Sequence, residues 1–242
     1  MSIINIDGFK MFEKAPYEKA DPKAILELVM RGATDVERLY GPVFTTNVIK
    51  YAVRAVANQT KEEAPQNIQT LSQLTEYLLS KSDRLTAPPY YIAFWAQYVT
   101  EKKLEGSLGA GYQVSKRGFA KGVMESDGDL RTLGFDVDKV MSKLRKLAVD
   151  MKVAPLEFGY KKNEDGSVDI VHGGCPYVEG CQSSAEQTLL QRPDGRISCG
   201  SSVFVCQFLK TATSCEWDHT VLEFSKPHCV TRVFMIQSVT HC

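Results

Sequence analysis

The sequence predicts an α+β protein, with helices first and a mainly antiparallel sheet last, and with helices inserted among the strands. Up to residue 151, apolar residues recur every three or four positions, the spacing of amphipathic helices. After Pro155 they alternate with polar residues, as on half-buried strands. At 242 residues the chain can bury one substantial core. We expect a single domain over residues 1–242, in which a helical portion (1–151) packs on a Cys- and His-rich α+β portion (152–242).

The helical portion opens with a clear start signal. Asp21 supplies an N-cap, and Pro22 has a ring that is preset for the first helical turn. The apolar period that follows ends at Gly41-Pro42, which stops the first helix. Further helices are expected around 48–56, 68–78, 92–99, a short segment after 106–111, and 137–151.

The second portion begins with a hairpin. Alternating segments at 156–160 and 168–172 flank Glu164-Asp165-Gly166, which has turn chemistry. Ser183 followed three positions later by Glu186 resembles a capping box, and so predicts a short helix after Cys181. We also expect a helix over 200–213 and two last strands over 219–224 and 230–236.

Composition and charge argue against several classes of protein. With 29 basic and 29 acidic residues, the formal net charge is zero, so no bulk field attracts nucleic acid or anionic lipid. The basic cluster of Lys116, Arg117 and Lys121 is expected on a solvated helix face. No secretion signal and no membrane-spanning apolar run is visible. We expect a soluble, cytoplasmic protein that binds neither nucleic acid nor membranes, and an odd thiol count argues against a disulfide framework.

All seven cysteines and all four histidines lie between residues 172 and 242. Soft ligands gathered in one segment point to a metal ion or a reactive thiol. Cys175 and Cys181 lie in a loop region after Gly173-Gly174, whose freedom suits a ligand loop. The alternative for Cys175 is a small buried apolar residue. We predict zinc, with an iron–sulfur cluster as the alternative.

Two further candidates bracket the connection between the last two expected strands. Glu223 places a carboxylate in an apolar strand, where an inward-facing side chain needs a cation, a metal or a donor. Facing outward, it is an ordinary solvated residue. Cys229 lies at the turn, and Cys206 lies among apolar residues of the expected helix, where the alternative is a packed core thiol.

An aromatic cluster marks the helix around residues 92–99. Tyr91, Trp95 and Tyr98 share one helical face. Large aromatic side chains with polar atoms suit a pocket for a planar ligand. The alternative is a helix-packing core or a homodimer interface.

The C-terminal segments resemble a known family. Residues 204–213, 220–223 and 229–236 are similar to the C-terminal half of the 4-vinyl-reductase-type ligand-binding family, which includes hydrocarbon-binding proteins; the likeness covers about residues 105–238. The resemblance implies a zinc ion held by Cys206 on a helix, Glu223 on a strand and Cys229 at a turn. The family's second turn cysteine is absent here, which leaves Cys181, Cys175 or water as the fourth ligand.

The resemblance implies a metal-containing protein that binds or senses a small apolar or aromatic molecule. One alternative is a thiol- or metal-dependent enzyme, a hydrolase or reductase acting on a small molecule. Another is an interaction module that dimerises through its aromatic face. No GxSxG, HExxH or Walker sequence is present, so the sequence does not indicate a particular reaction.

Overall fold

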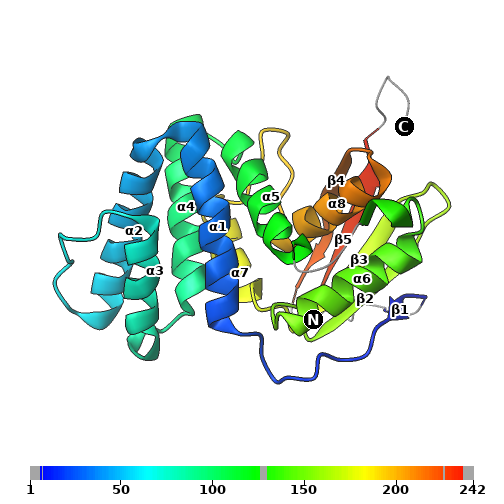
Figure 1. The fold of residues 1–242 in the computed structure, drawn as a ribbon, viewed down its shortest axis with the longest axis horizontal. Helices are drawn as coiled ribbons and strands as arrows, with labels where there is room; N and C mark the ends of the chain where they lie inside the picture. The colour runs from blue at the N-terminus through cyan, green and yellow to red at the C-terminus, as the bar shows by residue number, and fades with distance from the viewer. Residues whose placement is uncertain (1–5, 7, 126–129, 226, 237–242) are drawn as a thin grey trace. The chain divides into compact units, whose positions relative to one another are not determined.

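The protein is represented by a computed structural model that describes residues 6, 8–125, 130–225 and 227–236 (Figure 1). The α+β prediction is confirmed, since helices come first and an antiparallel sheet forms late in the chain. The chain divides into two compact units. Unit 1 comprises Met1–Ala20, Val123–Glu179 and Arg196–Cys242; unit 2 comprises Asp21–Gly122 and Gly180–Gly195. The organisation as a single domain stays a prediction.

Unit 2 is helical. Its helices are α1 (Pro22–Tyr40), α2 (Pro42–Thr60), α3 (Leu71–Ser80), the short η1 (Ser82–Arg84), α4 (Pro89–Glu105), most of α5 (Ala110–Met124) and most of α7 (Val178–Glu186). As predicted, the Asp21 side chain accepts a hydrogen bond from the backbone N–H of Lys23, at 2.9 Å. None of the helices in the described ranges is both long enough and apolar enough to cross a membrane.

Two helix starts differ from the sequence prediction, and each has a local cause. The third helix begins at Leu71 rather than near residue 68, because Thr70 and Gln73 form a reciprocal capping box. Helix α7 begins at Val178, before Cys181, and so the Ser183 capping box predicted the wrong start. At the start of this helix, the backbone N–H of Val178 donates a hydrogen bond to the carbonyl oxygen of Cys175.

Helix α5 packs closely on α1 through small residues. A Cβ atom added to Gly32 of α1 would overlap the carbonyl oxygen of Ser115 on α5. One added to Gly118 of α5 would lie 3.0 Å from the Cα atom of Gly32. Helix α5 has 15 residues and is longer than the short helix predicted there. Its glycines disfavour a helix by local propensity, but Gly118 allows the close approach to α1.

Unit 1 contains the sheet. Its strands are β1 (Lys10–Met11), β2 (Glu157–Lys162), β3 (Val168–Gly173), β4 (Trp217–Phe224) and β5 (His228–Met235), in the order β1-β2-β3-β5-β4, with every pair antiparallel. The unit also holds α6 (Val137–Asp150), α8 (Gly200–Thr213) and the short η2 (Leu130–Leu133). The four predicted strands are confirmed; the two-residue β1 is too short to show an alternating pattern.

One face of the sheet carries the helices α6 and α8 (Figure 1). The Ser202 and Thr231 hydroxyl groups lie 2.7 Å apart and mark the face of β5 that meets α8. Since side chains alternate along a strand, Cys229 lies on this same face. His172 on β3 pairs directly with Cys229, so it shares that face as well. On the opposite face, Asp169 and Arg232 form a bidentate ion pair.

Candidate metal centre

Three thiols of unit 1 lie at the end of β3, at the start of β5 and at the start of α8. Cys175 follows β3 directly after Gly174, whose φ of 56° favours glycine and where an added Cβ atom would lie 2.9 Å from the Leu156 side chain. Cys199 is the N-cap residue of α8. Cys229 is the buried second residue of β5.

These thiols are close enough to influence one another electrostatically. The Cys175 residue is partly exposed, but its sulfur is enclosed by protein, and this burial raises its pKa to about 12. Negative charge on Cys199 or Cys229 adds to that rise. Burial also raises the pKa of Cys229, with Cys199 and Glu223 contributing. Ionisation of one thiol therefore disfavours ionisation of the others unless a cation lies between them.

Within the described part of the chain, His172 has no hydrogen-bond partner for either ring nitrogen, although it is only 2% exposed. Its ring lies 5.6 Å from that of Phe158, measured between centroids. Burial lowers the pKa of His172 to about 4, so the imidazole is neutral at neutral pH. A buried polar atom without a partner costs about 1–3 kcal/mol. A neutral imidazole is also the form that binds a metal ion.

The structure brings some of the predicted ligands together and separates others. Cys175 and Cys229 both belong to the thiol group. Cys206 lies in the middle of α8, 6% exposed, and seven helical residues place it about 10 Å from Cys199 along the axis. Glu223 follows an irregularity in β4 and pairs with Val230 rather than with Cys229.

Two further cysteines of the described ranges lie outside this group. Cys181 lies on α7, in the part of that helix that belongs to unit 2. Cys215 is disulfide-bonded, which the sequence argument against disulfides did not anticipate. His241 and Cys242 lie outside the described residues.

Cys199 is the member of the group that sequence reasoning missed. The predicted helix start at residue 200 was correct, and that boundary makes residue 199 the N-cap. A thiol at this position lies beside the unpaired N–H groups and the positive end of a helix. The predicted start of this helix at residue 200 was therefore the sequence feature that could have identified Cys199 as a candidate.

The types of donor side chain fit a zinc ion, but their positions in this structure do not form a zinc site. Three thiolates and one neutral imidazole make a Cys₃His set, which is common in structural zinc sites. Within the ranges that the structure describes, no three Cys, His, Asp or Glu side chains are spaced so that they could hold a metal ion. Ligation by this group therefore requires its side chains to rotate toward a common centre.

The aromatic residues predicted to bind a ligand have separate neighbours within unit 2. Tyr98 stacks on Phe94, with ring centroids 5.8 Å apart. Trp95 meets Tyr51 of α2 edge-on at 6.1 Å. Tyr91 meets Tyr90 edge-on at 4.8 Å.

One open cavity of unit 2, about 360 Å³ in volume, lies between α1 and α3. Met30 and Leu71 contribute apolar surface to it, and Arg31 and Asp35 are among its charged residues. Tyr91, Trp95 and Tyr98 do not line this cavity. Binding of a small apolar or aromatic molecule by these three residues stays a prediction.

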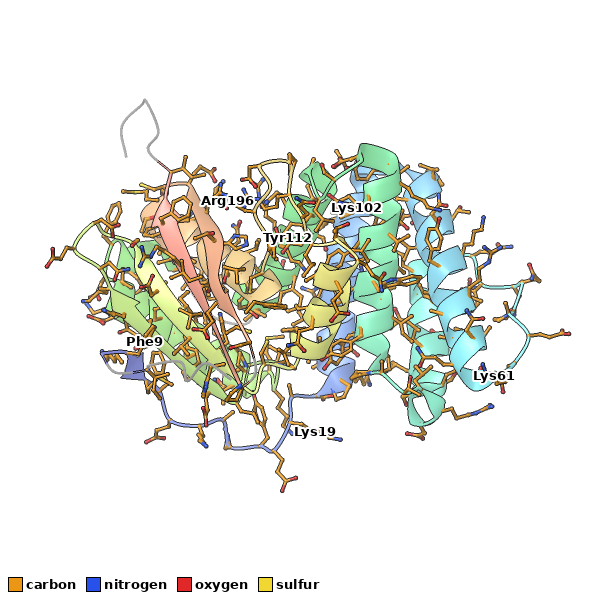
Figure 2. The ribbon with its side chains drawn as sticks, turned by 180° about the vertical axis from the view of Figure 1, so that it is seen from behind. Phe9, Lys19, Lys61, Lys102, Tyr112 and Arg196 are labelled. Carbon is orange, nitrogen blue, oxygen red and sulfur yellow. The ribbon has the colours of Figure 1, made fainter. Side chains whose placement is uncertain are left out.

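The expectation that Lys116 lies on a solvated helix face is wrong. It is only 2% exposed, and its ammonium group lies 3.8 Å from the centre of the Phe94 ring and 5.3 Å from that of Tyr112, which Figure 2 labels. Glu101, 3% exposed, accepts a hydrogen bond from the N–H of Gly109 at 2.7 Å. Burial raises the pKa of Glu101 to about 7, against the lowering effect of backbone donors and Lys116.

Comparison with known proteins identifies no relative. No protein-family model matches the sequence, and neither a curated protein nor a solved structure matches the chain. The resemblance to the 4-vinyl-reductase-type family therefore stays a prediction.

Proposed function

We propose that the protein binds zinc in unit 1, through the thiolates of Cys175, Cys199 and Cys229 and the imidazole of His172. The observation that supports this function best is the state of His172. It is buried and neutral, has no hydrogen-bond partner for either nitrogen among the residues that the structure describes, and lies opposite Cys229. Of the ligands expected from the sequence, the proposal keeps Cys175 and Cys229 and leaves out Cys181. It replaces Cys206 by Cys199 and the Glu223 carboxylate by the His172 imidazole.

A cation would resolve the electrostatic conflict among the thiols. Without a metal, burial and mutual repulsion keep Cys175 protonated at neutral pH. A bound Zn²⁺ ion deprotonates its cysteine ligands outright, because its charge outweighs both effects. Zinc binding would therefore release the thiol protons, and the charge of the ion would offset the repulsion between the resulting thiolates.

The proposed ligand set indicates a structural role for the ion. Four protein ligands close the coordination sphere, whereas a catalytic zinc keeps one position for water. The ligands come from the loop after β3, from β3 and β5 themselves, and from the N-terminus of α8. The ion would therefore connect the helix to the two central strands. If water took the place of His172, the open position would instead favour a metal-dependent enzyme.

Elemental analysis of the full chain, purified without chelator, tests the proposal. We expect about one zinc per chain, as for a structural site with four protein ligands. Cys199→Ser and Cys229→Ser should each lose the ion. Cys206→Ser is the matched control, because it alters a buried thiol of α8 outside the proposed ligand set. A colourless protein distinguishes zinc from an iron–sulfur cluster, which is brown.

Two results would contradict the proposal. Wild-type protein that carries no metal would remove the zinc function altogether. Loss of zinc from Cys206→Ser, with retention in Cys199→Ser, would instead favour the ligands implied by the family resemblance.

A further inference from the structure

The N-terminus of α8 is capped by a side chain from another element. Cys199 occupies the N-cap position, but its own side chain makes no capping hydrogen bond. Its backbone N–H instead donates to Nε2 of His219 on β4, at 2.9 Å. His219 is 1% exposed, so this bond lies in the interior of unit 1.

The hydrogen bond fixes which nitrogen of His219 carries the proton. Because Nε2 accepts from Cys199, the neutral ring carries its proton on Nδ1. Nδ1 lies 3.5 Å from Oδ1 of Asp218. His219 thus differs from His172, whose two nitrogens have no hydrogen-bond partner.

Asp218 and His219 are themselves held in place by Arg196, which Figure 2 labels. The Arg196 guanidinium donates to Oδ2 of Asp218 at 2.9 Å and to the backbone carbonyl of His219 at 3.4 Å. It also lies 5.5 Å from the centre of the Phe234 ring, on the strand next to β4. A charged and hydrogen-bonded chain therefore runs from Arg196 through Asp218 and His219 to the main chain of Cys199.

We propose that His219 is a positioning residue for the zinc site, which sets the main chain of Cys199 so that its thiol can join Cys175 and Cys229. This inference rests on the proposed zinc function. Residues that orient metal ligands typically change metal affinity 10- to 100-fold when they are replaced. The role assigned to His219 is distinct from ligation, because both ring nitrogens face groups of the protein.

The test compares three variants of the full chain. His219→Leu keeps a buried apolar side chain but leaves the N–H of Cys199 without its acceptor. His219→Gln can present an amide oxygen near the position of Nε2 and should restore the bond. Ser202→Ala is the control, since it removes a buried hydrogen bond from the same turn of α8 without touching Cys199.

Zinc affinity is measured by competition with a chromophoric chelator, and ligand geometry by the visible spectrum of the Co²⁺-loaded protein. We expect His219→Leu to bind zinc about 10- to 100-fold more weakly, with altered Co²⁺ bands. His219→Gln and Ser202→Ala should retain wild-type affinity and spectra. Unchanged affinity in His219→Leu, or equal weakening by Ser202→Ala, would overturn the inference.

A second measurement separates this inference from the zinc proposal. In metal-free protein, the rate at which iodoacetamide alkylates Cys199 reports how firmly its main chain is held. We expect faster alkylation in His219→Leu and a wild-type rate in His219→Gln. If the wild-type protein has no affinity for zinc, the zinc proposal is wrong. If all variants are alkylated at equal rates, His219 does not position Cys199.

Discussion

The side chains of Glu157 and His228 meet across Gly173, with Glu157 Oε2 2.8 Å from His228 Nε2. These residues belong to β2 and β5, on either side of β3, and Gly173 pairs with both. Strands two places apart are separated by about 10 Å, so long side chains meet only where the middle strand presents none. A Cβ atom on Gly173 would lie 2.7 Å from Cδ2 of His228 and 2.8 Å from Oε2 of Glu157.

The first prediction concerns Gly173→Ala. The added methyl group should separate Glu157 from His228 and destabilise unit 1 by about 1–3 kcal/mol, the usual cost of overpacking. Glu157→Gln is the control, because it removes charge but adds no volume, and contacts of a partly exposed carboxylate contribute at most about 1 kcal/mol. Urea unfolding measures both variants. Equal stability losses would show that the contacts of the Glu157 carboxylate, rather than the space above Gly173, determine the effect.

The second prediction concerns Glu101 and pH. Its pKa is raised from 4.5 to about 7 in the folded protein, so the folded state binds more protons than the unfolded state between these values. The free energy of unfolding should therefore fall as pH rises through this window and level off above it, by about 3 kcal/mol at most.

Glu101→Gln provides the comparison, because glutamine does not titrate. Urea unfolding of both proteins between pH 4.5 and pH 8 should show a smaller decrease for the variant. Parallel curves would mean that Glu101 does not titrate in this range.

The third prediction concerns the contact between α1 and α5. Replacing glycine by alanine inside a helix usually stabilises it by about 1 kcal/mol. Gly32→Ala should instead destabilise unit 2 by about 1–3 kcal/mol, because the new methyl group overlaps the Ser115 backbone. Thr34→Ala, at an exposed position of the same helix, is the control and should be nearly neutral. A stabilised Gly32→Ala variant, measured by thermal unfolding, would show that the helices separate easily.

The fourth prediction concerns His172→Phe. In metal-free protein this change should be neutral or stabilising, because it removes two buried nitrogens without partners. The same change should greatly weaken zinc binding. Chelator should therefore lower the melting temperature of the wild type and leave that of the variant unchanged. A variant that chelator still destabilises would retain its metal and exclude His172 as an essential ligand.

The fold class could be read from the sequence because periodicity records which face of each element is buried. The start of α1 at Asp21-Pro22 and the β2–β3 hairpin follow from local chemistry alone. β1 could not be predicted, because two residues show no period. The burial of Lys116 could not be predicted either, since its aromatic neighbours on α4 come from a distant part of the chain.

The candidate site was only partly predictable for the same physical reason. The concentration of thiols after residue 172 led to the prediction of a metal, which stays a prediction, and the proposed ligand set keeps Cys175 and Cys229 from it. Which third thiol joins them depends on how α8 lies on the sheet, a relationship that no local pattern records. The sequence did not identify His172 as a candidate ligand. It is a candidate because its ring nitrogens lack hydrogen-bond partners among the described residues, and this can be seen only in the folded chain.

The strand order has a consequence for how the protein is made. β5 is the last described strand to leave the ribosome, yet it lies between β3 and β4. The Asp169–Arg232 ion pair that joins β3 to β5 spans 63 residues, so this junction forms late and closes a long loop. Cys229 arrives on that same strand, opposite His172. The strand that completes the sheet is thus also the strand that carries the last candidate ligand. A nascent chain halted before β5 would lack both a complete sheet and Cys229.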